Sequence, residues 1–505
     1  MELKRRLRPR AGTVTRPGLA AVLCVGLVIT ASAGAADRVN ASTPGAARKA
    51  APGKTPAKKP PRKPSKAPAR TPAWARPTVG QQAPLQLISQ SRLDSRLREL
   101  VFSTPYLSAP TYVRVLLPAK YYSETTRRYP SLYLLDGCCN SAPQARDWTT
   151  PSSMGDAEQL TANDNMIVVM PDAGMGGMYT DWYNNGLGGV PRWESYIIGQ
   201  LRPWIDAHLR TIDDRAQRAI AGVSMGGFGA LKLAARHPDL FISASSFSGI
   251  VDSEYGAGVA GAEFDEALAA MDGGAPGSVF GPHATEDVRW RANNPVDLAG
   301  NLRGLTLELR VGNGDPGPYD QSPTQLAESH GEALMHEENV ILHQRLSALG
   351  LAHTWDDYGP GSHSWPYWNR DLARTLAALR TTFAHPPALP ATISFTTAEP
   401  DFTVYGYHVE LQRDVLEFAT LDGVTVRGFS LVGSGTATVT TAARYRAGHR
   451  YHVTNGTSGQ TLTANGQGRL VIRVDLGPSN ITQQFRLGAT TQSRRVSVAI
   501  APAAS

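Results

Sequence analysis

Cysteine is scarce in this sequence, with three residues among 505. Cys24 lies in an apolar segment near the N-terminus, and the other two, Cys138 and Cys139, are adjacent. Once the N-terminal segment with Cys24 is removed as a signal peptide, Cys138 and Cys139 can pair only with each other, in a strained ring, or remain thiols. The sequence therefore excludes a small fold held together by disulfides, and a packed hydrophobic core must stabilise the chain.

Long hydrophobic runs are also scarce, and residues 19–31 form the only one that approaches membrane-spanning length. A basic segment, residues 4–10, precedes this run, and small residues follow it at positions 31–36. This order is typical of a secretory signal peptide, which we predict over residues 1–36. It indicates an exported protein, secreted or held at the cell envelope. An uncleaved membrane anchor is the alternative.

Acidic residues are almost absent from the first 78 residues, where Glu2 and Asp37 accompany 17 lysines and arginines. The whole chain carries +7 and this segment carries +15, so the remainder carries −8. The basic overall charge is therefore no argument for nucleic-acid binding. A composition of Pro, Ala and Lys/Arg predicts a disordered linker over residues 37–84. The linker is either a spacer or a contact to anionic envelope polymers or lipid head groups.

Residues 85–386 alternate between short apolar runs and helical patterns. We expect strands at residues 111–117, 131–135, 166–170, 219–221, 244–247, 305–311 and 354–358, and helices at residues 203–209, 228–236, 338–349 and 369–383. Near-continuous apolar strands separated by helices indicate a mostly parallel sheet covered on both faces, in the α/β class. The active loops of such a sheet lie at the C-terminal ends of its strands.

The composition changes after Pro390. Residues 392–500 are rich in Thr, Val, Gly and Ser, and polar and apolar residues alternate in segments such as LVIRVDL. Many short strands with turns between them predict a small all-β sandwich, an accessory domain after the catalytic domain of residues 85–386. This segment has no cysteine, and we expect no cluster of acid–base groups in it.

The most informative stretch is residues 216–237. Residues 222–226, GVSMG, fit G-x-S-x-G, an apolar run precedes them, and a helical pattern follows. Strand, tight turn and helix in this order predict a nucleophile elbow with Ser224 as the nucleophile. Only small residues fit beside such a turn, here Gly222, Gly226 and Gly227. A plain glycine-rich turn is the alternative.

A nucleophilic serine needs a base and an acid. His363 follows the last predicted α/β strand and precedes the last helix of the domain, which is the usual place of the histidine in α/β-hydrolases. The acid must lie between Ser224 and His363, and the residues alone leave the choice open among Asp315, Asp320, Glu328, Glu332, Glu337 and Glu338. The histidines near residues 330–343 lack H-E-x-x-H spacing, so we expect no metal and no cofactor.

The chain from about residue 110 to 385 resembles the antigen 85 mycolyltransferases and the wider esterase D-like group of α/β-hydrolases. The matching segments are residues 134–137 (LLDG), 170–172 (MPD), 179–183 (YTDWY), 193–194 (WE), 222–225 (GVSM), 312–314 (GNG) and 363–368 (HSWPYW). The resemblance implies an α/β-hydrolase fold and serine acyl-ester chemistry. It also implies a triad acid shortly before the helix that precedes the histidine strand. The matching position is Glu332, with Asp315 as the alternative.

An oxyanion hole needs two N–H donors. We expect one from the backbone of Met225, directly after the nucleophile. The loop after residues 131–135 fits as the source of the second, and the resemblance implies the N–H of Cys138; a plain turn is the alternative. The resemblance also implies that Asp136 and Trp365 line a pocket for an acceptor sugar, although Trp365 fits a packing role equally.

Three features depart from the antigen 85 pattern. Cys139 stands where that family carries an arginine, Gly226 stands where it usually has an alanine, and residues 392–500 are no part of its minimal fold. The first departure removes a presumed sugar contact. Together they bear on mycolate specificity more than on acyl transfer itself.

These observations predict an exported serine acyltransferase or esterase that works through an acyl-enzyme on acyl esters of sugars or lipids. We expect mycolyl or other acyl transfer to a carbohydrate hydroxyl, with a lipid or glycolipid ester as donor. A carboxylesterase that hydrolyses short acyl, acetyl or feruloyl esters is the first alternative. A non-catalytic glycan-binding surface protein is the second, and a peptidase on the same scaffold has only the triad in its favour.

Overall fold

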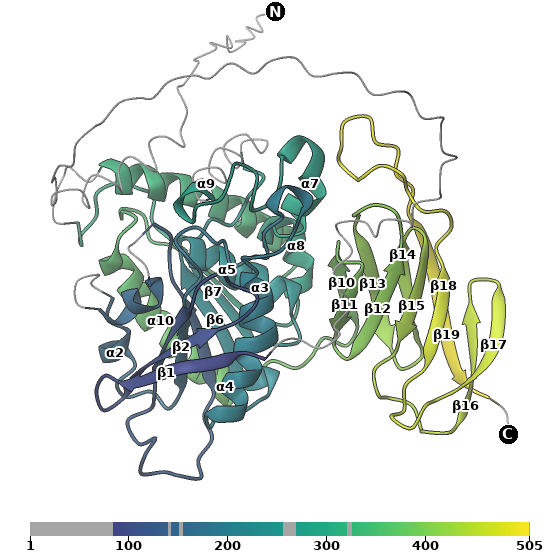
Figure 1. Cartoon of the computed structure of the whole chain (residues 1–505), viewed down its shortest axis with the longest axis horizontal. Helices are drawn as coiled ribbons and strands as arrows, with labels where there is room; N and C mark the ends of the chain where they lie inside the picture. Colours follow the sequence, from purple (N-terminus) through teal and green to yellow (C-terminus); the bar gives the residue numbers. More distant parts are fainter. Residues whose placement is uncertain (1–83, 140–142, 151–154, 256–268, 321–325, 504–505) are drawn as a thin grey trace, which may run out of the picture.

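The computed structural model of the chain describes residues 84–139, 143–150, 155–255, 269–320 and 326–503 (Figure 1). The predicted signal peptide and residues 37–83 of the predicted linker lie outside these ranges. Within the described ranges, no helix combines the length and the apolar character that crossing a membrane requires.

A nine-stranded sheet forms the centre of the N-terminal unit, in the order β1-β2-β3-β5-β4-β6-β7-β8-β9. Neighbours from β5 to β9 in this order run parallel. The first three strands pair antiparallel, and β3 is also antiparallel to β5. The strands are β1 (Gln86–Arg92), β2 (Leu97–Ser103), β3 (Thr111–Leu116), β4 (Ser131–Leu135), β5 (Ile167–Pro171), β6 (Arg218–Val223), β7 (Ser243–Phe247), β8 (Thr306–Val311) and β9 (Thr354–Asp357).

Every strand predicted for this unit is present. The central strands β4 to β7 are buried along their whole length and read as continuous apolar or small-residue runs. The two strands that the sequence did not predict, β1 and β2, lie at one edge of the sheet. All residues of β1 are exposed, so no buried face imposes an apolar alternation on it.

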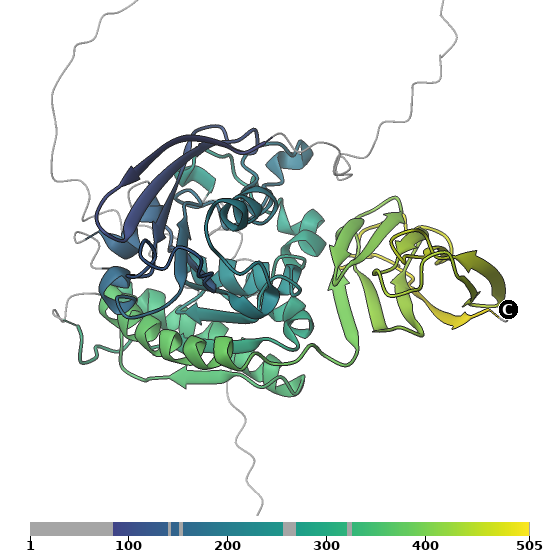
Figure 2. The same cartoon turned by 90° about the horizontal axis from the view of Figure 1, so that it is seen from below.

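Helices cover both faces of the sheet (Figure 2). Tyr133 of β4 packs in one hydrophobic core with Phe228 of α5, whereas the next residue, Leu134, packs in a second core with Leu376 of α10. Because successive side chains of a strand point to opposite faces, α5 and α10 lie on opposite sides. The helices are α2 (Ala157–Leu160), α3 (Trp193–Tyr196), α4 (Arg202–His208), α5 (Met225–Arg236), α7 (His283–Arg291), α8 (Pro295–Leu298), α9 (Leu326–Ala348) and α10 (Trp365–Ala384).

Helix α9 begins earlier than predicted, at Leu326 rather than at residue 338. Glu332 therefore lies inside this helix, and the expectation that it precedes the helix is wrong. Gly331 interrupts the sequence pattern, since glycine inside a helix is less favourable than alanine by about 1 kcal/mol. Tertiary packing overrides this preference, because Met335, Leu342 and Leu346 of α9 are buried in the core.

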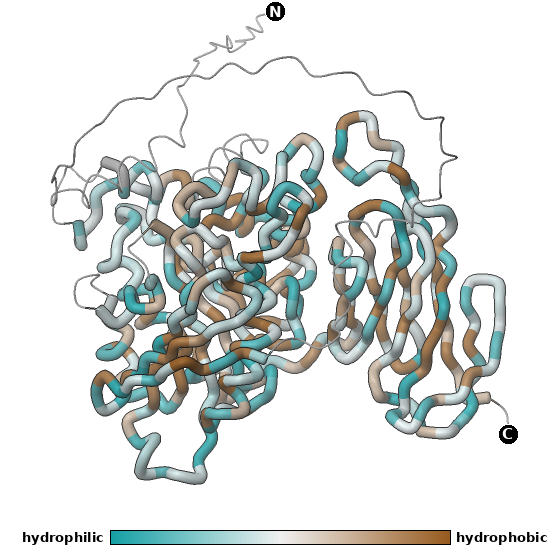
Figure 3. The backbone as a smooth tube through the Cα atoms, in the orientation of Figure 1, coloured by the Kyte–Doolittle hydropathy of each residue, from teal (hydrophilic) through white to brown (hydrophobic). Residues whose placement is uncertain are grey.

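The C-terminal unit is a β-sandwich, as predicted. A six-stranded sheet (β10-β13-β14-β19-β16-β17) faces a four-stranded sheet (β11-β12-β15-β18), and all neighbours are antiparallel. Hydrophobic stretches run along the strands of both units (Figure 3). The strands are β10 (Ile393–Thr397), β11 (Asp401–Val404), β12 (Tyr407–Gln412), β13 (Ala419–Thr425), β14 (Gly428–Gly433), β15 (Thr436–Thr440), β16 (Arg450–Asn455), β17 (Ser458–Thr463), β18 (Val471–Asp475) and β19 (Arg494–Pro502).

Polar contacts join the sandwich to the α/β unit. Asn301 and Thr396 exchange two hydrogen bonds, of 2.8 and 2.9 Å, and Arg236 forms a 2.6 Å ion pair with Glu399. A cavity of about 380 Å³ opens at the same boundary, lined by residues of both units. None of the predicted site residues is among the described residues that line this cavity.

A buried ion network joins α3 to the C-terminal part of α5, the helix that follows the predicted nucleophile. Glu194 is 4% exposed and contacts Lys232, Arg236 and His237, each at 2.9 Å. Burial alone raises the pKa of Glu194, and the adjacent Arg236 and Lys232 outweigh it, so this pKa lies well below its usual range. The carboxylate therefore stays ionised and balances cations that have little access to water.

We expect Glu194→Gln to destabilise the α/β unit by about 3–5 kcal/mol, because it leaves buried cations without their counter-charge. Urea unfolding followed by tryptophan fluorescence reports on this unit and not on the sandwich, since residues 392–505 contain no tryptophan. The matched control is Glu124→Gln, which makes the same chemical change at the exposed pair with Arg127 in the same unit and should leave stability nearly unchanged. Equal effects of the two variants would contradict the network's role.

Candidate active site

Ser224 lies at the tight turn between β6 and α5, in the predicted order of strand, turn and helix. Its φ of 54° is uncommon for a residue with a side chain. The glycines beside it are required by space, because a Cβ atom at Gly222 would lie 2.3 Å from the Gly226 carbonyl oxygen. A Cβ atom at Gly226 would in turn lie 2.5 Å from the carbonyl oxygen of Asp136. The turn thus packs directly against the loop that follows β4.

Glu332 and His363 are in contact. The Nδ1 atom of His363 lies 2.8 Å from the Glu332 carboxylate, which is fully buried. The other carboxylate oxygen accepts hydrogen bonds from the Ser248 hydroxyl (2.8 Å) and the Gly312 amide (2.7 Å). With an ionised Glu332, Nδ1 carries the proton and Nε2 is left as the basic nitrogen, an assignment that follows from the hydrogen bonds.

The other candidate acids lie in other contacts. Asp315 is exposed and hydrogen-bonded to Asn313 within its own turn. Asp320 binds Ser362 and Tyr367, Glu337 binds Tyr255, and Glu338 accepts the amide of Asp252. Glu328 contributes its backbone carbonyl, which accepts the His363 amide at 3.2 Å. Among the described residues, Glu332 alone has its carboxylate hydrogen-bonded to the His363 ring.

Ser224 and His363 are not hydrogen-bonded to each other within the described part of the chain. The Ser224 side chain is nearly buried, at 7% exposure for the residue. Catalytic hydrogen bonds are often long in substrate-free enzymes and tighten when substrate binds. The serine–imidazole step therefore stays a prediction, while the imidazole–carboxylate contact is an observed geometry.

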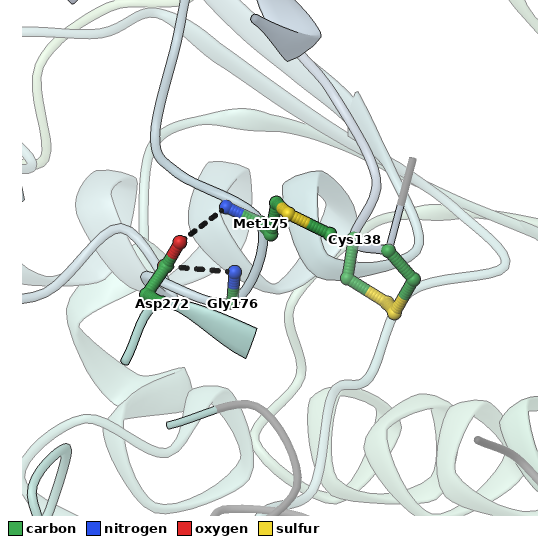
Figure 4. Close-up of a disulfide and its surroundings, with 5 residues drawn as sticks. Cys138, Met175, Gly176 and Asp272 are labelled. Carbon is green, nitrogen blue, oxygen red and sulfur yellow. Dashed lines mark hydrogen bonds between the residues drawn. A yellow bond between two sulfur atoms is a disulfide. The ribbon is translucent and has the colours of Figure 1, made fainter. Parts of the chain in front are cut away.

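The loop after β4 lies against the predicted nucleophile. A Cβ atom at Gly137 would lie 3.5 Å from the Cβ of Ser224. Of the two states that the sequence allowed for the adjacent cysteines, the structure has the disulfide between Cys138 and Cys139. Asp272 accepts the amides of Met175 and Gly176 beside this disulfide (Figure 4).

Two backbone amides near Ser224 are available as donors. In the described ranges, the amide of Cys138 has no hydrogen-bond partner, whereas that of Cys139 donates to the Met175 carbonyl at 3.0 Å. Met225 is the first residue of α5, and the first amides of a helix have no partner within it. These positions match the expected oxyanion donors, whose function stays a prediction.

Asp136 and Trp365, the predicted lining of a sugar pocket, are both buried. Asp136 is 2% exposed, and within the described residues neither carboxylate oxygen has a hydrogen-bond partner. Burial raises the pKa of Asp136 well above its usual range, and the nearby Asp147 and Asp172 add to this shift, which favours the protonated form. Trp365 packs edge-on against Trp148, with ring centroids 5.0 Å apart. Sugar binding by either residue stays a prediction.

Several residues that support the site were not predicted from the sequence. Ser248 and Tyr358 both donate to Glu332, the latter at 3.4 Å. Trp368 packs edge-on against the His363 ring at 4.9 Å between centroids, and its Nε1 donates to Ser248 at 3.4 Å. Of these residues, only Trp368 could have been found from the sequence, because it belongs to the HSWPYW segment that matches the family. Ser248 and Tyr358 come from separate loops that only the fold brings together.

Two groups of His and carboxylate residues could hold a metal ion within the described ranges. The first comprises Glu254, His283 and Asp287, and Arg291 pairs with both of its carboxylates and offsets part of their charge. The second comprises Asp401, His408 and Glu410 of the sandwich. The expectation that residues 392–500 hold no cluster of acid–base groups is therefore wrong, because the β11–β12 hairpin pairs residues that are apart in sequence.

Comparison with known proteins shows which family the chain is similar to. The "Esterase" family model matches residues 104–379, more than half of the chain. An esterase of Mycobacterium tuberculosis is 34% identical over 304 residues, which are 59% of this chain and 62% of the relative, so the chain spans less than two thirds of that protein. The diacylglycerol acyltransferase/mycolyltransferase Ag85B of Mycobacterium leprae is 29% identical over 263 residues, 51% of this chain and 77% of the relative.

Among solved structures, MPT51 of Mycobacterium tuberculosis aligns with a TM-score of 0.45 and 22% identity, over 56% of this chain and 96% of MPT51. The resemblance to antigen 85 and esterase D-like α/β-hydrolases that the sequence indicated is confirmed by the family match and by the Ag85 relatives.

Proposed function

Because the chain belongs to the esterase family, we propose that it is a serine enzyme that cleaves acyl esters through an acyl-enzyme. Ser224 is the nucleophile, His363 the base, and Glu332 the acid that orients the imidazole. The observation that carries this proposal is the 2.8 Å contact between Glu332 and His363. His363 follows β9 and Ser224 follows β6, so both lie at the C-terminal ends of the parallel strands.

In the first half-reaction, Ser224 Oγ attacks the ester carbonyl carbon while its proton passes to His363 Nε2. The carbonyl oxygen becomes an oxyanion and accepts hydrogen bonds from the amides of Cys138 and Met225. The tetrahedral intermediate then breaks its bond to the leaving alcohol, which takes the proton from His363. The acyl group remains on Ser224, and a second alcohol or water removes it by the same steps in reverse order.

We propose further that the acceptor is a carbohydrate hydroxyl and that the protein acts outside the cytoplasm. The Ag85B relative, named a diacylglycerol acyltransferase/mycolyltransferase, supports acyl transfer, and the predicted signal over residues 1–36 supports export. Hydrolysis is the second candidate, favoured by Cys139, which stands where the antigen 85 pattern has a sugar-contacting arginine. The relative from Mycobacterium tuberculosis is named an esterase.

A fluorophosphonate probe tests the proposed nucleophile. Trypsin releases residues 219–232, AIAGVSMGGFGALK, in which Ser224 is the sole hydroxyl residue. We expect the probe's mass on this peptide after labelling of the native protein, and none after labelling of the heat-unfolded protein, because activation of the hydroxyl requires the folded site. A native protein that takes up no probe would support the glycan-binding alternative instead.

The products formed from the acyl-enzyme show which acceptor it uses. After a single turnover with a lipid ester, trehalose or an arabinan fragment is added in water, and sugar ester and free acid are quantified. We expect the sugar ester to exceed the free acid at millimolar sugar. Free acid as the sole product would assign the chain to the carboxylesterases.

A further inference from the structure

The Cys138–Cys139 disulfide lies in the loop that is proposed to supply one oxyanion donor. This loop follows β4 directly and contacts the nucleophile through Gly137, whose added Cβ would lie 3.5 Å from that of Ser224. Both cysteines are half-buried rather than enclosed in the core, and we expect a small reductant to reach the disulfide. The disulfide, which a reductant can break, therefore begins at the residue after Gly137, the glycine that faces Ser224.

Ring closure fixes the loop from within. The disulfide joins successive residues with Cα atoms 3.8 Å apart, so a small ring encloses the peptide bond after Cys138. Cys139 has a φ of 75°, a left-handed conformation that residues with a Cβ rarely adopt. Once the ring is open, no covalent bond opposes the return of Cys139 to an ordinary backbone conformation.

Hydrogen bonds fix the loop from outside. The Cys139 amide donates to the Met175 carbonyl at 3.0 Å. Asp272 in turn accepts the amides of Met175 at 2.9 Å and Gly176 at 3.0 Å, which anchors this second loop (Figure 4). In the described ranges, the Cys138 amide itself has no partner and stays available to a ligand. The disulfide ring and the anchored loop at Met175 thus both restrain the backbone that orients the free N–H of Cys138.

We propose that the Cys138–Cys139 disulfide is a positioning element of the oxyanion hole and that its reduction converts the enzyme to a slow form. This inference rests on the proposed function above. A dithiol such as dithiothreitol breaks the S–S bond: the two sulfur atoms gain two electrons and two protons, and the dithiol loses them as it closes to its own disulfide. The freed loop then presents the Cys138 N–H away from the oxyanion.

An oxyanion donor acts on the tetrahedral state far more than on bound substrate, so its displacement lowers kcat and leaves KM nearly unchanged. Deletion of such a donor costs about 10²–10³ in kcat, and we expect displacement to cost about 10- to 100-fold. Affinity for a boronic acid, which forms a tetrahedral adduct on the serine, should fall by a similar factor. Loosening of the fold in general would not single out the tetrahedral state in this way.

The experiment measures kcat and KM for a p-nitrophenyl ester on the full-length protein before reduction, after dithiothreitol and its removal, and after reoxidation. Mass spectrometry verifies each state through the gain and loss of two hydrogen atoms. We expect kcat to fall on reduction and to recover on reoxidation, with KM within about two-fold throughout. Recovery in the same molecules excludes misfolding as the cause.

Two variants complete the design. Cys24→Ser removes the only other cysteine and should respond to reductant as the wild type does. Cys138→Ala/Cys139→Ala should have the kcat of the reduced enzyme and no response. A fully reduced wild type with unchanged kcat, a change carried by KM alone, or a double variant that still responds would each overturn the inference. An oxidised wild type without ester turnover would instead overturn the proposed function.

Discussion

Replacement of Ser224 by alanine should lower kcat by about 10⁴- to 10⁶-fold, the range seen when a serine nucleophile is deleted. The hydroxyl is the atom that bonds to the acyl group, so no acyl-enzyme forms without it. Residual turnover over the uncatalysed rate should remain, since the oxyanion donors at Cys138 and Met225 are backbone groups that the substitution does not remove. Steady-state kinetics with a p-nitrophenyl ester measures the loss.

The fold should survive this substitution. The Ser224 amide donates to the Phe247 carbonyl at 2.9 Å, and alanine keeps this bond. Ser430 in β14 of the sandwich provides the matched control, because Ser430→Ala removes an equivalent hydroxyl far from the proposed chemistry and should leave kcat unchanged. Activity in Ser224→Ala above one hundredth of the wild-type value would refute the assignment of the nucleophile.

The parts of the molecule that the sequence predicted are those where local pattern and tertiary structure agree. The strand, turn and helix around Ser224 were predictable because β6 is buried throughout and Gly222 and Gly226 have no room for a Cβ atom. The sandwich was predictable from short alternating strands separated by turns. In both cases, the residues that determine the structure are neighbours in sequence.

The parts that the sequence did not predict depend on contacts between distant segments. The start of α9 is set by burial of its apolar residues against the sheet, which outweighs the unfavourable Gly331. The support of Glu332 by Ser248 and Tyr358 joins residues separated by 84 and 26 positions. The resemblance to the antigen 85 family, rather than any local pattern, singled out Glu332 among the six candidate carboxylates.

The second large effect on kcat is expected from substitution of the proposed triad acid. We expect Glu332→Gln to lower kcat by about 10³- to 10⁴-fold. The carboxamide oxygen can still accept from the Ser248 hydroxyl and the Gly312 amide, so its NH₂ group must point at His363 Nδ1. That nitrogen then has to accept a hydrogen bond, which moves the imidazole proton to Nε2 and removes the base.

Asp315→Asn is the matched comparison, since it makes the same chemical change at the rival position. Asp315 is exposed and bonded within its own turn, so kcat should stay within about two-fold of the wild type. Thermal melting of both variants separates loss of chemistry from loss of fold. The reverse outcome, with Asp315→Asn inactive and Glu332→Gln active, would move the acid to the loop after β8 and require that loop to close onto His363 when substrate binds.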